Sequence, residues 1–257
     1  MTAAFAGIGV DAERIERFAK LAAGGPRWRH VYSQAEADHL ASLDRAQLRF
    51  CAAFCCKEAV LKSLGERYPF TECECGFQPG SFEPAIVLSP ALLGRYALTG
   101  ARVRFHERFP EERAECVLEV HLIRGSAGAP GGPGGHPPAV TPPRSRLETL
   151  AIAEVEAARD TIEVRDFSPA EIADLGRRRV QSLAGFLALK RALVALWRDA
   201  GFAAAAAPRD VELAHRASGA PQVAAAPPGL PEALVSIAHT RHWAYGLAVL
   251  PQSADHR

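Results

Sequence analysis

The 257-residue chain lacks several features that would point to a membrane, a nucleic acid or a secretory route. Its formal net charge of +1 gives no reason to expect nucleic acid or an anionic membrane surface as the main partner. It contains no run of the roughly eighteen apolar residues that a membrane span needs. Its N-terminus is briefly apolar but has no basic segment before it, as a signal peptide would. We therefore expect a cytoplasmic protein that binds neither nucleic acid nor membrane.

The six cysteines lack the paired CxxC spacing of a zinc knuckle. Cys51, Cys55 and Cys56 fall within one apolar segment, where reduced cysteines serve as small hydrophobic side chains. A hydrophobic content of 48% with 23% charged residues is ordinary for a globular protein. The composition therefore predicts a reduced protein with a substantial core and no structural zinc.

A Gly/Pro-rich segment at 125–146 shows no hydrophobic periodicity and is typical of a flexible linker. It separates two stretches of similar length, which we expect to be domains covering 1–124 and 147–257. At 257 residues the chain is long enough for two such domains.

The two stretches resemble each other at three landmarks in the same order. Residues 32–40 match residues 167–175, and Lys57 falls in a helical segment that matches the one around Lys190. Each stretch then ends in alternating apolar runs typical of a β-hairpin, at Ala101–His106 with Ala114–Ile123 and at Leu234–His239 with Trp243–Leu250. This order favours an internal duplication. The predicted fold is α+β, with two tandem pseudo-symmetric domains, each a helix packed on a small antiparallel sheet.

The most informative segment is a predicted helix that changes from apolar to charged. Residues 48–56 are apolar almost all round, which predicts a buried helix. Positions 51, 55, 58 and 62 form one stripe of that helix, so the stripe runs from cysteines to Glu58 and Lys62. Because unpaired buried charge is costly, this stripe is expected to open onto a polar site.

Simpler interpretations of these charges stay open. Glu58 and Lys62 have the spacing of a surface ion pair, worth roughly 0.3–0.5 kcal/mol. Asp11 could be the N-cap of a helix that starts near Ala12 and continues to Phe18.

The two halves differ in where they carry polar residues. Arg191 and Ala195 stand in the second half where the first has Glu58 and Lys62, whereas the second half carries a Ser236-x-x-His239 segment. This division predicts a single site between the halves, with its pseudo-symmetric twin lost.

Several motifs together resemble the 4′-phosphopantetheinyl transferase superfamily. The opening Gly7-Ile8-Gly9-Val10-Asp11 is similar to that of holo-acyl-carrier-protein synthase, and the segment from Phe54 through Lys57-Glu58-Ala59 to Lys62 resembles the W-x-x-K-E-[SA]-x-x-K motif, with Phe for Trp. The segment Val235–Thr240 resembles the S-I-S-H-T strand, and Gly219-Ala220-Pro221 resembles the G-K-P turn. The similarity covers both halves except the linker. The lysine of G-K-P is Ala220 here, and the serine before the histidine is Ala238.

The resemblance implies Mg²⁺-dependent transfer of 4′-phosphopantetheine from coenzyme A to a serine of an apo acyl or peptidyl carrier protein, in one site formed by two fused copies. It implies Asp11 and Glu58 as metal ligands, with Glu13 a third, since Mg²⁺ prefers oxygen donors. The implied catalytic residues are Glu58, Lys62 and His239, and the general base stays open between Glu58 acting through a water and His239. The implied coenzyme A contacts are Lys62, Arg179, Gly219, Pro221, Ser236, His239 and Thr240.

Other interpretations compete with an active transferase. His239 can be a structural residue at a strand end, and Ser236 and Thr240 ordinary strand and turn residues. Glu36 and Glu171 are expected to be helix-start acids, and an alternative role for Glu36 is to approach the metal. The chain could also be a degenerate homologue that binds coenzyme A or a carrier protein without catalysis, or a docking module within a synthase cluster. As a fused pseudo-dimer it is expected to be a monomer, and its carrier would belong to a fatty-acid, polyketide or peptide synthase.

Overall fold

The computed structural model describes residues 4–23, 29–66, 68–78, 81–106, 115–124, 143–175, 179–202 and 207–251. It divides into two compact units, whose described parts cover 4–124 and 143–251.

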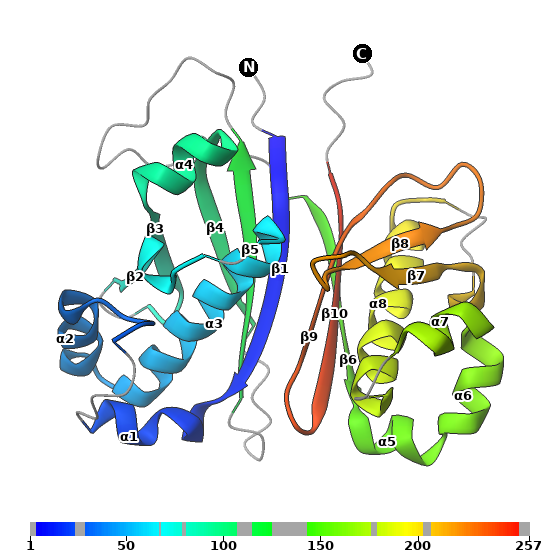
Figure 1. Cartoon of the computed structure of the whole chain (residues 1–257), viewed down its shortest axis with the longest axis horizontal. Helices are drawn as coiled ribbons and strands as arrows, with labels where there is room; N and C mark the ends of the chain where they lie inside the picture. Colours follow the sequence, from blue (N-terminus) through cyan, green and yellow to red (C-terminus); the bar gives the residue numbers. More distant parts are fainter. Residues whose placement is uncertain are drawn as a thin grey trace. The chain divides into compact units, whose positions relative to one another are not determined.

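The first unit is a three-stranded antiparallel sheet covered by one long helix, with a separate two-stranded hairpin (Figure 1). The sheet has the order β1-β5-β4, and β2 pairs with β3. The strands are β1 (Ala4–Arg14), β2 (Cys73–Phe77), β3 (Pro84–Leu88), β4 (Leu98–His106) and β5 (Glu115–Arg124). The helices are η1 (Ile15–Phe18), α1 (Ala19–Ala22), α2 (Gln34–Ser42), α3 (Ala46–Leu64), η2 (Phe70–Glu72) and α4 (Pro90–Tyr96).

Helix α3 forms the centre of this unit's core. Every residue from Leu48 to Lys57 is buried, as the apolar sequence predicts. The helix packs against the sheet through Cys116, Leu118 and Val120 of β5, which belong to the same hydrophobic cluster as its own buried residues. It ends at Gly65, whose positive φ of 70° is the usual way for a helix to stop.

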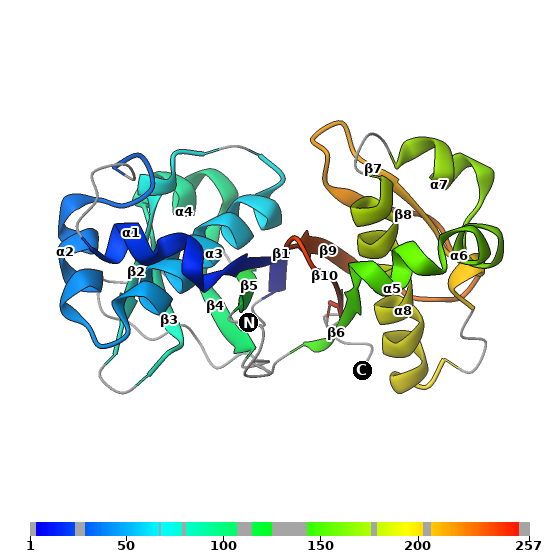
Figure 2. The same ribbon diagram turned by 90° about the horizontal axis from the view of Figure 1, so that it is seen from below.

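The second unit has the same kinds of element in the same sheet order. Its sheet is β6-β10-β9, and β7 pairs with β8. The strands are β6 (Arg144–Ala151), β7 (Glu212–His215), β8 (Pro221–Ala225), β9 (Leu234–His239) and β10 (Trp243–Leu250). The helices are α5 (Ile152–Ala157), α6 (Arg159–Asp166), α7 (Pro169–Asp174), α8 (Arg179–Asp199) and η3 (Pro208–Asp210). Figure 2 shows α8 lying along this sheet as α3 lies along the first.

The predicted α+β class is confirmed, since each unit is a long helix on a small antiparallel sheet. In each unit the last strand lies in the middle of the three-stranded sheet, between the unit's first strand and the strand that precedes it in the hairpin. The two sheets therefore share one topology. The second predicted hairpin agrees with β9 and β10 at both ends. In the first hairpin, β4 begins at Leu98, before the predicted start, and the predicted start of the return strand at Ala114 lies outside the described residues.

The segment expected to be a linker can be compared with the structure only at its end. Residues 125–142 lie outside the described residues, and β6 begins at Arg144, inside the range of 125–146 expected for the linker. Residues 144–146 belong to a strand because β10 supplies the pairing partners Ala248, Val249 and Leu250.

Helix α8 is long enough to cross a membrane, although Lys190 and Arg191 interrupt its apolar residues. By length and composition alone it is apolar enough to do so, and in the described residues it is the single helix that is. Of its most apolar window, 72% is buried inside the unit, as in the core helix of a globular domain.

Candidate functional site

Two glycines let strand β1 lie directly on helix α3. A Cβ atom on Gly9 would stand 1.8 Å from the Ala59 carbonyl oxygen, and one on Gly7 would stand 2.4 Å from that of Ser63. Because side chains alternate along a strand, Asp11 and Glu13 share the face of β1 that carries these glycines. The contact runs antiparallel, so Asp11 lies beside Cys55 and the Glu13 backbone beside Cys51 of α3.

Asp11 forms an ion pair with Lys62 across this contact. The Lys62 Nζ atom lies 2.7 Å from Asp11 Oδ1 and also donates to the Val10 carbonyl oxygen at 3.1 Å. The Asp11 side chain is 12% exposed and that of Lys62 33%. Burial raises the pKa of Asp11, while the charge of Lys62 opposes the shift. The pair thus combines a desolvated carboxylate with an ammonium group that solvent can still reach.

Glu58 and Glu13 add negative charge to the same place. Burial raises the pKa of Glu58, the negative charge of Asp11 raises it further, and Lys62 acts against both. Glu13 forms an ion pair with Arg17 and accepts a hydrogen bond from the Arg14 backbone N–H at 3.0 Å. Its negative charge raises the pKa of both Asp11 and Glu58.

These three acids have the chemistry of a hard-cation site. They offer carboxylate oxygens, which Mg²⁺ prefers, and Mg²⁺ usually needs only one or two of them. Burial is the main cause that raises the pKa of Asp11 and Glu58; the neighbouring carboxylates raise it further, and a divalent cation would relieve that repulsion. The residues present therefore fit such an ion. The interpretation of Asp11 as a helix N-cap is wrong, because β1 continues through it to Arg14.

Lys57, next to Glu58 in the sequence, lies in the core. Its side chain is fully buried, and its Nζ atom lies 2.7 Å from Glu36 Oε2. It also donates to the carbonyl oxygens of Val31, Phe70 and Cys73 at 2.9, 3.1 and 2.5 Å. The other oxygen of Glu36 accepts the Cys75 backbone N–H at 2.8 Å. Glu36 is thus a helix-start acid, as predicted, but its carboxylate joins α2 to α3 and β2.

The second unit repeats this buried ion pair. Lys190 Nζ lies 2.7 Å from Glu171 Oε2 and donates to the Asp166 carbonyl oxygen at 2.7 Å. The other oxygen of Glu171 accepts the Leu213 backbone N–H at 2.9 Å, so α8, α7 and β7 are joined in the same way. Sequence inspection missed both pairs, although the matching positions of Glu36 and Glu171 in the repeat were a signal.

Strand β9 carries the serine and histidine that the sequence singled out. Ser236 is buried and His239, the last residue of the strand, is exposed. Three residues apart on a strand, they lie on opposite faces of β9. The hydroxyl oxygen of Thr240 accepts the backbone N–H groups of His242 and Trp243 at 3.2 and 3.1 Å, which closes the β9–β10 turn. Thr240 therefore has a structural role in this turn.

The remaining candidates of the second unit lie at a turn and at a helix start. Gly219, with a φ of +84°, belongs to the turn between β7 and β8, where a left-handed conformation favours glycine. Pro221 is the first residue of β8. Arg179 begins α8, and its guanidinium lies 2.7 Å from Glu163 Oε2 at an exposed position.

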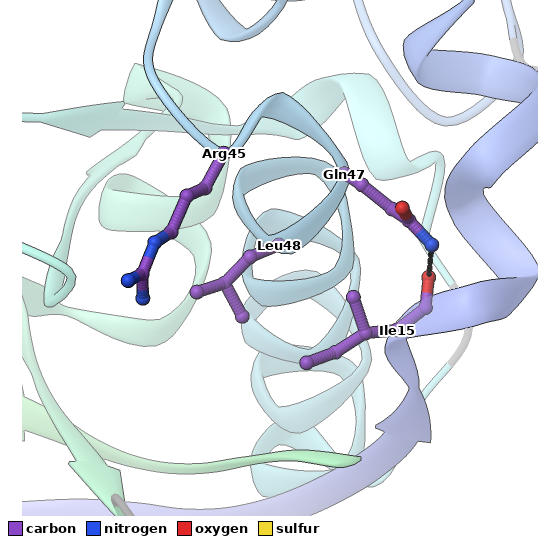
Figure 3. Close-up of a pocket in the computed structure, with 4 residues that line it drawn as sticks. All are labelled: Ile15, Arg45, Gln47 and Leu48. Atoms are coloured by element: carbon purple, nitrogen blue, oxygen red, sulfur yellow. Dashed lines mark hydrogen bonds between the residues drawn. The ribbon is translucent and has the colours of Figure 1, made fainter. Parts of the chain in front are cut away.

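A surface pocket of about 370 Å³ lies at the N-terminal end of α3 (Figure 3). Ile15, Arg45, Gln47 and Leu48 line it, and Gln47 donates to the Ile15 carbonyl oxygen at 2.9 Å. Leu48 and Glu58 are about 15 Å apart along the helix axis, at about 1.5 Å per residue. The pocket is therefore separate from Glu58, whereas Glu13 is only two residues before the pocket-lining Ile15.

Comparison with known proteins agrees with the motifs of the first unit. Residues 7–100 match the model of the 4′-phosphopantetheinyl transferase superfamily, which confirms the resemblance over this part of the chain. The match contains Asp11, Glu13, Glu58 and Lys62. No curated protein shows a match.

Solved structures of holo-acyl-carrier-protein synthases are distantly similar. The Helicobacter pylori protein, in complex with coenzyme A, is 21% identical, with 41% of this chain and 97% of that chain covered and a TM-score of 0.34. The Bacillus anthracis protein is 17% identical, with 48% and 99% covered and a TM-score of 0.38. A Plasmodium yoelii protein with ADP bound is 14% identical, with 49% and 100% covered and a TM-score of 0.40. At these TM-scores the likenesses do not bear on the activity of this chain.

Proposed function

We propose that the chain is a 4′-phosphopantetheinyl transferase of the holo-acyl-carrier-protein synthase type. It would move the phosphopantetheine group from coenzyme A to a serine of an apo carrier protein, releasing adenosine 3′,5′-bisphosphate, in the cytoplasm. The observation that carries the proposal is the cluster of Asp11, Glu58 and Lys62, held together by the packing of β1 on α3 within the segment that matches the superfamily.

The chemistry assigns a part to each of these side chains. Asp11 and Glu58, with Glu13 nearby, would hold Mg²⁺, which supplies positive charge to a pyrophosphate when bound. The ammonium group of Lys62 is partly exposed and can contact a phosphate oxygen as a point charge. A base must take the proton of the carrier serine, and Glu58 acting through a water or His239 can do so. Burial raises the pKa of Glu58, which makes its carboxylate a stronger base than an ordinary glutamate.

The proposal also assigns one site to the whole chain, with the C-terminal half contributing His239 to the pyrophosphate or the serine. Its support is the distribution of residues: Arg191 and Ala195 stand where the first half has Glu58 and Lys62. If two fused copies share one surviving set of acids, both halves are needed to form the site. A single chain would then be sufficient for activity.

Intact-mass measurement of an apo acyl carrier protein tests this function. The carrier is incubated with the full chain, coenzyme A and Mg²⁺, with and without EDTA. A mass gain of one phosphopantetheine that EDTA abolishes is expected. Glu58→Gln should remove the gain, while Glu154→Gln, at an exposed position of α5, should keep it. The set is repeated with polyketide and peptidyl carrier domains.

A different outcome would identify a binding protein. If coenzyme A binds to the chain but none of the carriers gains mass, the transferase proposal fails and a non-catalytic homologue remains. The replacement of the G-K-P lysine by Ala220 is the observation that favours this second candidate. A His239→Gln variant with full activity would remove that residue from the proposed site.

A further inference from the structure

Three buried cysteines lie beside the acid cluster, where the Cys55 thiol hydrogen-bonds with Asp11 and the Cys51 thiol donates to the Glu13 carbonyl oxygen at 3.6 Å; the proposed transfer does not use their sulfur atoms. Cys51 and Cys55 face the sheet from α3, and Cys116 lies on β5. All three are 0% exposed and carry free thiols. Their sulfur atoms all lie within 4.8 Å of one another. Two turns of a helix and one strand therefore bring three thiols to a single point.

The size of this sulfur triangle fits one ion in the middle. Three sulfurs that surround an ion at about 2.3 Å are about 4 Å apart. In a triangle with sides of 4.8 Å, the outer limit here, each sulfur would move toward the centre by only about 0.5 Å. Rotation about a cysteine χ1 angle moves a sulfur by more than this, so the backbone need not change.

The number and kind of ligands select the ion. Zinc in structural sites is almost always four-coordinate, and among the described residues no fourth His, Cys, Asp or Glu side chain joins the group. Thiolates are soft ligands that select Cu⁺, which has no need of an oxygen donor. We infer that Cys51, Cys55 and Cys116 form a three-coordinate site for Cu⁺. This inference does not depend on the proposed transferase function.

The chain offers its own control in a second group of three cysteines. Cys56 of α3 hydrogen-bonds with Cys75 of β2, which also hydrogen-bonds with Cys73. All three are buried, yet their sulfurs do not form such a compact triangle within the described structure. Loss of a thiol from this second group should therefore leave Cu⁺ binding unchanged.

Titration of the full chain with Cu⁺ tests the site. Under anaerobic conditions and with a phosphine as reductant, Cu⁺ is supplied as its complex with a coloured chelator. The mixture is left to reach equilibrium, because the structure around the buried thiols must open locally before Cu⁺ can enter. We expect one Cu⁺ per chain, with thiol protons released for the thiolates formed. Loss of a residue that only hydrogen-bonds to a metal ligand lowers metal affinity by about 10–100-fold. Because Cys116→Ala removes a ligand itself, it should lower the Cu⁺ affinity by more than about 100-fold. Cys73→Ala should bind as the unchanged chain does.

X-ray absorption on the unchanged chain gives an answer that needs no variant. Three sulfur neighbours around copper are expected. Failure of the chain to take Cu⁺ from the chelator, two sulfur neighbours, or retained affinity in a folded Cys116→Ala variant would each overturn the inference.

Discussion

Removal of the Lys57 ammonium group should destabilise the first unit strongly while leaving the second almost unchanged. In a Lys57→Met variant the Glu36 carboxylate, whose side chain is 2% exposed, would remain buried without its counter-charge. Breaking a buried ion pair by removing one partner costs about 3–5 kcal/mol. The carbonyl oxygens of Val31, Phe70 and Cys73 would also lose their donor. We therefore expect a cost near the upper end of that range.

The repeat supplies a reciprocal control. Lys190→Met leaves Glu171 buried in the same way, but there the ammonium donates to one backbone carbonyl, that of Asp166, in the described structure. Each acceptor left without a donor costs about 1–3 kcal/mol, so Lys190→Met should cost less than Lys57→Met. A Lys57→Met, Glu36→Gln double variant should recover part of the loss, because a neutral buried amide costs less than a carboxylate.

Urea unfolding gives the free energy, and amide hydrogen exchange read by mass spectrometry assigns it to a unit. Lys57→Met should lower protection in α3 but not in α8, and Lys190→Met should do the reverse. If Lys57→Met lowered the free energy of unfolding by less than about 1 kcal/mol, the buried pair would not have the energetic role given to it. Equal loss of protection in both helices would show that the pair does not act within one unit.

Three further predictions concern the residues around the sheet. Gly9→Ala should cost at least about 1–3 kcal/mol, because its Cβ would meet the Ala59 carbonyl oxygen, whereas Gly94→Ala, with open space around it, should be neutral or stabilising in thermal unfolding. Burial raises the pKa of Glu58 above its usual 4.5, so the folded chain binds that proton more tightly than the unfolded chain, and the free energy of unfolding falls as pH rises through the folded-state pKa. In urea unfolding measured at several pH values, Glu58→Gln should make this decrease smaller. Burial alone would raise the pKa of Glu119, but hydrogen bonds from two histidines lower it to about 2. The ionised carboxylate should therefore stabilise the fold above pH 4.5, and this contribution should vanish near pH 2. If a Glu119→Gln variant lost stability between these pH values as the unchanged chain does, Glu119 would not be the group responsible.

Local patterns in the sequence predicted the features that depend on neighbours along the chain. The apolar run predicted the burial of α3, and the spacing of Cys51, Cys55 and Lys62 placed all three on the face toward β1 and β5. The alternating runs predicted β9 and β10 because a hairpin needs only its own two strands and turn.

Features set by partners distant in the sequence were missed or misread. Residues 12–18 resemble a helix start, yet β1 continues to Arg14 because β5 offers a pairing partner up to Glu115. Local helix preference is weak compared with such pairing. The Lys57–Glu36 pair joins residues that are 21 positions apart on different helices, and no periodicity within one helix reveals it.

The adjacent pair Lys57-Glu58 combines a buried residue of the core with a residue of the proposed site. Successive residues of an α-helix point about 100° apart, so Lys57 can enter the core while Glu58 faces the acid cluster. The second unit keeps the buried lysine as Lys190, but its next residue, Arg191, is exposed. The residue that holds the fold is thus present in both units, whereas the acid is present in the first alone. A repeat that had kept two working sites would be expected to keep both residues twice. A buried lysine in both units with Glu58 in the first alone is the pattern that the proposal of a single set of metal-binding acids predicts.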